Sequence, residues 1–208
     1  MADNEHDNRL VRVIPNVLTL GRLVLTIIFL GMILYAPRLE GKKPAGFLLT
    51  AFIIFVVAGL TDIVDGKIAR MYNVTSKFGR MVDPLADKVL VCGAFICFAL
   101  VGQPKLANFP ISDFTLSIIL WAVAVILVAR ELLVTIVRHL AEARGINFGA
   151  TASGKIKMFL QSFGIGTVII KWAYVTRFWG DWFTIVTFAI MVVVTVISGV
   201  SALTRPRE

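Results

Sequence analysis

Long apolar runs alternate along the chain with short polar stretches that contain proline, glycine or charged residues. Several of these runs reach or approach the roughly 20 residues that an α-helix needs to cross a bilayer. The pattern predicts an all-α, polytopic membrane protein with six transmembrane helices. The expected spans cover residues 17–35, 45–60, 84–101, 114–143, 155–175 and 179–203.

Two of the predicted helices extend beyond the bilayer. Polar residues after residue 60 keep a helical spacing, so we expect the second helix to continue to Met71. The run 114–143 has no helix breaker, and thirty residues at ~1.5 Å each make about 45 Å of helix. Its end is therefore expected to project into water.

The N-terminal residues differ from the rest of the chain. Residues 1–8 are polar and acidic, and we expect them to be disordered. Residues 9–14 alternate basic and apolar side chains, which is typical of a segment that lies on a membrane surface. Pro15 and Asn16 are predicted to open the first helix. Residues 1–14 would then form a tail and a short interfacial segment.

Composition supports one membrane domain over residues 1–208. Hydrophobic residues make up 58% of the chain, and the mean hydropathy of +0.85 exceeds that of ordinary soluble domains. The net charge of +8 could suggest nucleic acid as a partner. In a chain of membrane spans, however, basic loops more often mark the cytoplasmic side and contact anionic lipids, so we expect membrane lipids and no nucleic acid.

The distribution of basic residues predicts the orientation. With six spans, fifteen of the 21 Lys and Arg residues fall on the side that holds both termini and residues 61–88. Positive charge concentrates on the cytoplasmic side of membrane proteins. We therefore expect a multi-pass protein with both termini and its active site in the cytoplasm.

Four aspartates lie between two apolar runs, where carboxylates are costly and usually functional. Asp62 and Asp65 are spaced i and i+3, and Asp83 and Asp87 are spaced i and i+4, so each pair shares a helix face. Pro84 follows Asp83 as a proline follows the N-cap of a helix, which predicts a helix start there. The segment 71–80 would turn the chain back and bring the four carboxylates together.

A cluster of carboxylates without His or Cys favours hard divalent cations. Two such ions about 3.5–4 Å apart would clamp a phosphoryl group during its displacement. Gly66, Gly79 and Ala69 would let a ligand approach the backbone closely, and Arg70 offers a fork for phosphate oxygens. The residues thus predict phosphoryl-transfer chemistry at residues 61–88.

These residues resemble the signature of the CDP-alcohol phosphotransferase family. The pattern is Asp62-x-x-Asp65-Gly66-x-x-Ala69-Arg70, eight residues, then Gly79-x-x-x-Asp83-x-x-x-Asp87, and all eight signature positions are present. The resemblance implies a membrane-embedded enzyme that moves a phosphatidyl group from a CDP-linked lipid to an alcohol and releases CMP. It also implies a bacterial cytoplasmic-membrane location and a homodimer.

The resemblance implies a role for each residue. The four aspartates would hold two Mg²⁺ or Mn²⁺ ions, and Asp87 would also take the proton from the acceptor hydroxyl. CDP-diacylglycerol (CDP-DAG) would place its nucleotide against the CDP-binding residues Asp62, Gly66, Ala69, Arg70, Ser76 and Gly79. The stretch IPNVLTLGR also resembles the opening of the family, so Asn16, Thr19 and Arg22 are secondary candidates.

A second group of basic residues lies near residues 130–157. Arg130 and Arg138 are spaced i and i+8 and so lie near one helix face. Lys155 and Lys157 open the next helix, whose N-terminus favours an anion. The spacing fits a cradle for a second phosphate, and it fits equally well side chains that reach lipid headgroups.

This second group is similar to the bacterial phosphatidylglycerophosphate synthase branch of the family. The similarity rests on Arg130-Glu131, Arg138, Gly145, Gly154-Lys155-x-Lys157 and Gln161. It implies sn-glycerol 3-phosphate as acceptor, with its phosphate held by Arg130, Arg138 and Lys155. Met158 departs from the branch, where a threonine is common.

Other functions fit part of the pattern. A cardiolipin synthase or a phosphatidylinositol-phosphate synthase would share the first motif but take another acceptor. Prenyltransferases also use aspartate pairs, but without the spacer from Gly66 to Arg70. A divalent-cation transporter would carry acids in several spans, whereas residues 17–35 and 155–175 contain none.

Overall fold

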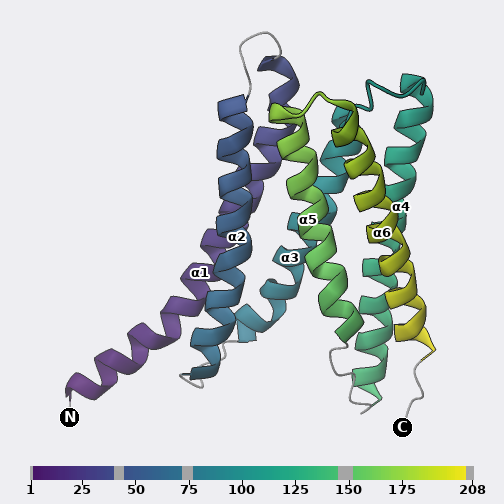
Figure 1. Cartoon of the computed structure of the whole chain (residues 1–208). Helices are drawn as coiled ribbons and strands as arrows, with labels where there is room; N and C mark the ends of the chain where they lie inside the picture. Colours follow the sequence, from purple (N-terminus) through teal and green to yellow (C-terminus); the bar gives the residue numbers. More distant parts are fainter. Residues whose placement is uncertain (1, 40–44, 72–76, 145–151, 205–208) are drawn as a thin grey trace. The chain divides into compact units, whose positions relative to one another are not determined.

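The computed structural model describes residues 2–39, 45–71, 77–144 and 152–204, and it describes side chains for 17–39, 45–61, 85–141, 143–144, 154 and 156–204 (Figure 1). These residues form helices and the short connections between them, without a β-strand, so the all-α prediction is confirmed. The elements are α1 (Ala2–Tyr35), a 3₁₀-helix η1 (Ala36–Leu39), α2 (Ala45–Met71), α3 (Lys77–Val101), α4 (Asp113–Ala143), α5 (Ala152–Tyr174) and α6 (Phe178–Leu203).

Most helix ends lie close to their predicted positions. Helix α2 ends at Met71, ten residues after its apolar part, as the spacing of polar residues predicted. Helices α4 and α6 each begin one residue before the predicted start and end at the predicted residue. Apolar periodicity and flanking glycines and prolines therefore suffice to locate these helices.

Two predicted helix starts are wrong, and both involve proline. Helix α1 begins at Ala2, so residues 2–8 are helical rather than disordered, and Pro15 lies inside the helix. Helix α3 begins at Lys77, so Pro84 is its eighth residue and Asp83 is no N-cap. A proline inside a helix removes one backbone hydrogen bond and crowds the carbonyl four residues earlier, and membrane helices tolerate both effects. The sequence alone does not distinguish such a proline from one at a helix start.

The membrane class is confirmed, and the number of spans stays a prediction. Among the described residues, three stretches are long and apolar enough to cross a bilayer: Val17–Leu39, Asp113–Ala141 and Phe178–Leu203. The apolar part of α2, Ala45–Thr61, is shorter. The interfacial placement of residues 1–14 and the single-domain interpretation also remain predictions.

The contacts divide the chain into two compact units, Met1–Gly93 and Ala94–Glu208. In the first unit, α1 packs along α2 (Figure 1). The rings of Phe29 and Phe55 lie 5.4 Å apart between these helices, and Ile33 and Leu48 are fully buried beside them. Burial of such side chains is the main favourable term that holds the two helices together.

In the second unit, α6 packs against both α5 and α4. Gly164 of α5 lies so close to α6 that a Cβ atom there would be 3.0 Å from Sδ of Met191. Phe95, in the last two turns of α3, makes an edge contact with Phe188 of α6. A glycine and aromatic side chains thus set the close approach of the helices.

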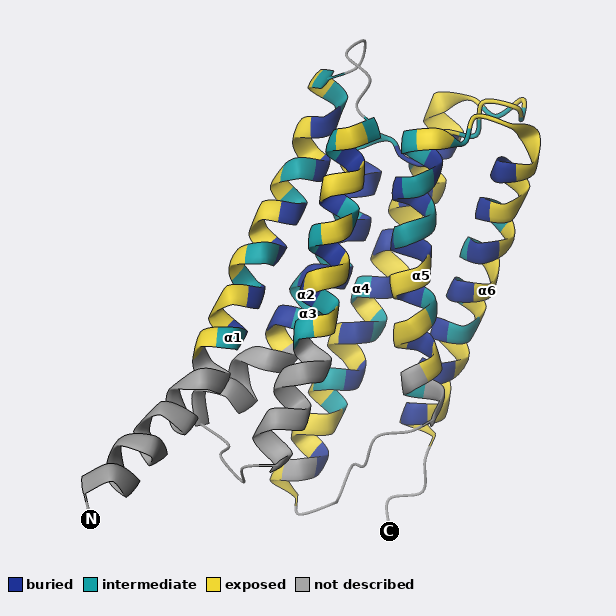
Figure 2. Cartoon of the chain, turned by 60° about the vertical axis from the view of Figure 1, so that its left-hand side comes forward, coloured by how far each residue is buried: buried dark blue, intermediate teal, exposed yellow. Residues whose placement is uncertain are grey.

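Helix α6 buries hydroxyl groups and exposes aliphatic side chains. Thr184, Thr187, Thr195 and Ser198 are buried on one side of the helix. Figure 2 shows the buried positions recurring along one side of α6, with exposed positions between them. Those exposed positions include Val186, Val193, Ile197 and Val200. This polarity is the reverse of a soluble amphipathic helix and suits lipid outside and protein inside.

A buried polar cluster joins the start of α6 to α5 and to the loop before α4. Lys171 of α5 lies 2.8 Å from Oδ1 of Asp181, and both side chains are buried. Asn108 of the loop donates to Oδ2 of Asp181 from its backbone N–H (3.0 Å) and its side chain (2.8 Å). Lys171 also donates to the backbone carbonyl of Lys105. We call Asn108, Lys171 and Asp181 the loop cluster.

Candidate active site

Helices α2 and α3 carry the aspartate motif. Asp62, Asp65, Gly66, Ala69 and Arg70 all lie in the last ten residues of α2. Because this segment is helical, positions i, i+3, i+4 and i+7 fall on one face, as the spacing predicted. Their side chains are outside the described ones, so their roles stay predictions.

The second half of the motif lies on one helix rather than at a helix start. Gly79, Asp83 and Asp87 follow one another at intervals of four residues on α3 and so share its face. The early start of α3 therefore places Gly79 on the same helix as both aspartates. Ser76 lies outside the described residues, as does any contact it makes.

Asp87 is the motif carboxylate whose side chain is described, and it pairs with Arg22 of α1. Nη2 of Arg22 lies 3.3 Å from Oδ1 of Asp87. The side chain of Arg22 is 1% exposed, whereas that of Asp87 is 32% exposed. A buried guanidinium needs such a partner, because an unpaired buried charge is strongly destabilising. Asp87 is thus held by α1 and remains accessible.

The surroundings of Arg22 bear on the three secondary candidates at the start of the chain. Arg22 faces the protein interior and contacts the site, and it does not extend to the lipid headgroups. Thr19, three residues earlier on the same face of α1, is also buried. The side chain of Asn16 is outside the described ones.

The metal prediction rests on the donor set. Four carboxylates supply oxygen ligands only, which fits Mg²⁺ or Mn²⁺. Within the described side chains, no group of three or more His, Cys, Asp and Glu residues forms a metal-binding cluster. Three of the four proposed ligands fall outside that search, so the metal site stays a prediction.

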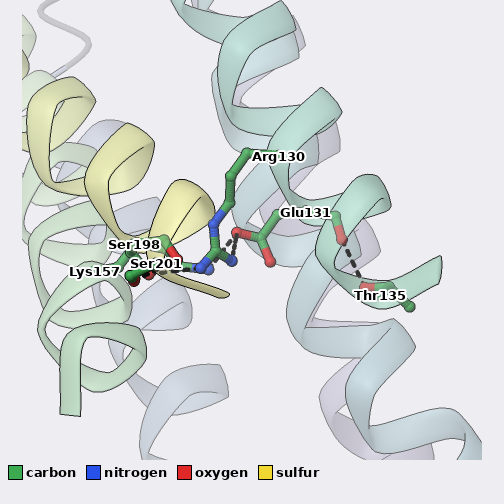
Figure 3. Close-up of polar contacts among 6 residues, drawn as sticks. All are labelled: Arg130, Glu131, Thr135, Lys157, Ser198 and Ser201. Carbon is green, nitrogen blue, oxygen red and sulfur yellow. Dashed lines mark hydrogen bonds and ion pairs between the residues drawn. The ribbon is translucent and has the colours of Figure 1, made fainter. Parts of the chain in front are cut away.

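A second polar cluster joins α4, α5 and α6 (Figure 3). Arg130 of α4 donates from Nη1 to Oε1 of Glu131 (3.1 Å) and from Nη2 to Oγ of Ser198 on α6 (2.6 Å). Lys157 of α5 forms an ion pair with the same Oε1 atom of Glu131. We call Arg130, Glu131, Lys157 and Ser198 the basic cluster.

The basic cluster differs from the predicted set of phosphate-binding residues. The structure brings Arg130 together with Lys157, which the prediction left out in favour of Lys155. The side chain of Lys155 is outside the described ones, and Arg138 lies exposed two turns further along α4. The sequence carried one signal for these contacts: an acid in a membrane helix usually pairs with a cation, so Glu131 could pair with an arginine or orient it.

Three buried polar atoms near this end of the unit have no hydrogen-bond partner among the described residues: Nε of Arg130, Nε2 of Gln161 and Oγ1 of Thr195. Gln161 follows Lys157 by one helical turn, and Thr195 precedes Ser198 by one turn. Buried polar groups are nearly always hydrogen-bonded. The basic cluster and its neighbours therefore have donor and acceptor capacity that their own contacts do not use.

Comparison with known proteins shows which protein family this sequence matches. The family model described as CDP-alcohol phosphatidyltransferase matches residues 12–198 of the chain. This match includes both the aspartate motif and the basic cluster.

Two bacterial relatives cover most of the chain. A probable phosphatidylglycerophosphate synthase of Mycobacterium tuberculosis is 33% identical over 192 residues, which is 92% of this chain and 80% of the relative. A CDP-diacylglycerol–glycerol-3-phosphate 3-phosphatidyltransferase of Bacillus subtilis is 34% identical over 163 residues, 76% of each chain.

A solved structure shares the fold. The crystal structure of phosphatidylinositol phosphate synthase from Mycobacterium tuberculosis with CDP-DAG bound aligns with a TM-score of 0.55. It covers 94% of this chain and 92% of that protein at 20% sequence identity. At this identity the likeness establishes the fold alone.

Proposed function

Because this chain belongs to the CDP-alcohol phosphatidyltransferase family, we propose that it transfers the phosphatidyl group of CDP-DAG to sn-glycerol 3-phosphate, which yields phosphatidylglycerophosphate and CMP. The observation that carries the choice of acceptor is the basic cluster, in which the buried Lys157 and the largely buried Arg130 share one carboxylate. The names of the relatives from Mycobacterium tuberculosis and Bacillus subtilis agree with this acceptor.

The aspartate motif would bind the donor. Asp62, Asp65, Asp83 and Asp87 would hold two Mg²⁺ or Mn²⁺ ions, which when bound neutralise the pyrophosphate charge. The small residues Gly66, Ala69 and Gly79 would leave room for the nucleotide. Arg70 and Ser76 would contact it, together with Asp62. The acyl chains would remain in the lipid.

Asp87 would act as the general base. Its carboxylate takes the proton of an acceptor hydroxyl, and the hydroxyl oxygen attacks the lipid-side β-phosphorus. A new P–O bond forms to the acceptor as the bond from the β-phosphorus to the CMP oxygen breaks. Arg22, whose Nη2 lies 3.3 Å from Oδ1 of Asp87, would keep the carboxylate oriented while one carboxylate oxygen accepts the proton.

Arg130, Arg138 and Lys155 would hold the acceptor's phosphate. Charge-assisted hydrogen bonds to phosphate oxygens are roughly twice as strong as neutral ones. An acceptor without a phosphate would form none of these bonds and would therefore bind more weakly.

We place the enzyme in the bacterial cytoplasmic membrane as a multi-pass homodimer, with the active site and both termini on the cytoplasmic side. The stretches Val17–Leu39, Asp113–Ala141 and Phe178–Leu203 support the membrane location. The excess of Lys and Arg on the side that holds both termini supports the orientation.

The first test is CMP release by the purified protein in detergent, with CDP-DAG and Mg²⁺ or Mn²⁺. Glycerol 3-phosphate, phosphatidylglycerol and inositol phosphate are offered separately. We expect release with glycerol 3-phosphate alone. Release only with another acceptor would retain the aspartate motif and reject the acceptor assignment.

The alternatives give different results in the same assay. A cardiolipin synthase would use phosphatidylglycerol, and a phosphatidylinositol-phosphate synthase would use inositol phosphate. A cation transporter would release no CMP and would instead carry Mg²⁺ or Mn²⁺ into vesicles that contain no CDP-DAG.

A further inference from the structure

We propose that Glu131 is the positioning residue of the acceptor site, and that it fixes Arg130 and Lys157 as a preformed pair of phosphate-binding cations. This inference rests on the proposed function and adds Glu131 and Lys157 to its acceptor residues. It assigns the glutamate a role through its neighbours, without contact to the substrate.

The contacts of the basic cluster converge on a single oxygen atom. Oε1 of Glu131 accepts from Nη1 of Arg130 at 3.1 Å and from Nζ of Lys157. Glu131 is 9% exposed and Lys157 is 5% exposed, so water screens these charges only weakly. Figure 3 shows Arg130 and Glu131 meeting between α4 and the helices that carry Lys157 and Ser198.

The charge of the basic cluster is suited to an anion. Two cations share one carboxylate, which leaves a formal charge of +1. A guanidinium has five N–H donors, and the described contacts of Arg130 use one to Glu131 and one to Ser198. Donors therefore remain for phosphate oxygens. The excess positive charge of these residues over Glu131, together with the remaining donors of Arg130, suits an anionic ligand.

Packing holds the arginine in place as well. Its aliphatic stem lies against α6 at Gly199, where a Cβ atom would be 3.1 Å from Cγ of Arg130. Ser198, the preceding residue, accepts from Nη2. The guanidinium is thus fixed from α4 by Glu131 and from α6 by Ser198. Groups fixed before binding lose less conformational entropy when the ligand arrives.

Replacement of Glu131 by glutamine distinguishes positioning from net charge. The Glu131→Gln variant raises the charge of the basic cluster to +2 with almost no change in size. If charge alone governed affinity, glycerol 3-phosphate would bind more tightly. If Glu131 positions the two cations, their repulsion separates them, and the acceptor binds more weakly despite the added charge.

The experiment measures KM for glycerol 3-phosphate and for CDP-DAG, with direct binding of glycerol 3-phosphate by calorimetry without CDP-DAG. For Glu131→Gln we expect an acceptor KM and Kd raised about tenfold, which is the loss of one charge-assisted hydrogen bond. The KM for CDP-DAG should change less than twofold. Glycerol, which lacks the phosphate, serves as the probe for non-specific binding.

A charge-restored variant and a matched control complete the design. Glu131→Gln/Lys157→Gln returns the cluster to +1, and we expect its acceptor KM to stay raised. Asp181→Asn breaks another buried ion pair of the same unit, seventeen residues before Ser198 on α6. That control should lower thermal stability without a selective change in acceptor KM.

The outcomes separate this inference from the proposed function. An acceptor KM for Glu131→Gln that is unchanged or lower, or a double variant with the parental value, would overturn the positioning role while glycerol 3-phosphate remained the acceptor. A parent protein that neither binds nor uses glycerol 3-phosphate would overturn the proposed function itself. If Glu131→Gln does not fold, Ser198→Ala tests the other anchor of Arg130, with an expected increase of a few-fold in the same KM.

Discussion

Arg22 is the most buried arginine among the described side chains, and its guanidinium forms an ion pair with Asp87, the proposed general base. We expect Arg22→Gln to lower kcat about tenfold or more, because loss of this ion pair leaves the Asp87 carboxylate less firmly held in the reactive orientation. The KM values for both substrates should change little. Steady-state kinetics of the variant provide the test.

Arg38→Gln is the matched control for Arg22, because Arg38 is an exposed arginine on η1. It should leave kcat within twofold of the parent. An equal loss of kcat in both variants would show that Arg22 contributes only positive charge.

Arg138 and Asp62 allow predictions about the two substrates separately. Arg138→Ala should raise the KM for glycerol 3-phosphate more than that for CDP-DAG, since it removes a cation from the acceptor's phosphate alone.

Asp62→Asn should abolish turnover while the protein still folds. A variant at Asp62 that keeps its rate would reject the metal role of that residue.

At the residue scale, sequence spacing predicted which residues share a helix face, but it did not predict which residues of different helices contact one another. The intervals in the aspartate motif are properties of one helix, so they follow from counting along the chain. The contact of Glu131 with Lys157 joins residues 26 positions apart, and that of Arg130 with Ser198 joins residues 68 apart. Such contacts depend on how helices pack, which local spacing does not contain.

At the scale of helices and loops, the loop cluster should determine much of the stability of the second unit. Asp181→Asn leaves the buried ammonium of Lys171 without its carboxylate, and breaking a buried pair in this way costs about 3–5 kcal/mol. We expect a clear fall in the Tm of the protein in detergent. Asp113→Asn, at an exposed position in the first turn of α4, should leave Tm nearly unchanged.

Helix ends show where sequence patterns fail. The C-terminal end of α2 follows from continued helical spacing, and the structure confirms it. The starts of α1 and α3 were misplaced because Pro15 and Pro84 resemble helix-start prolines. Asp181 was missed for a similar reason: it lies in the first turn of an apolar run, where an acid usually faces water, yet it is buried.

For the whole molecule, divalent cations should control activity. Removal of metal with EDTA should abolish CMP release, and added Mg²⁺ or Mn²⁺ should restore it, because the proposed ions would neutralise the pyrophosphate charge during the transfer. Ca²⁺ is a useful comparison, since it prefers longer bonds and more ligands than Mg²⁺. Full activity in the presence of EDTA would reject the metal assignment.

Orientation in the membrane can be tested at the two ends of α4. Lys105 in the loop before this helix and Arg144 after it are exposed and flank the candidate span Asp113–Ala141. In a background without Cys92 and Cys97, an impermeant thiol reagent added to intact cells should label Lys105→Cys and not Arg144→Cys. The opposite labelling pattern would place the active site outside the cytoplasm.

The reversed polarity of α6 has a genetic consequence. A single C-to-T transition converts a threonine codon of the ACH type into an isoleucine codon, and the resulting chain looks more hydrophobic and better suited to a membrane. At Thr187 or Thr195, however, the new side chain would enter the protein interior, where it is larger than the space it fills. A hydropathy scale would therefore rate these threonine-to-isoleucine substitutions in α6 as harmless, although selection should remove them most strongly. The exposed valines of α6 should vary more among related sequences.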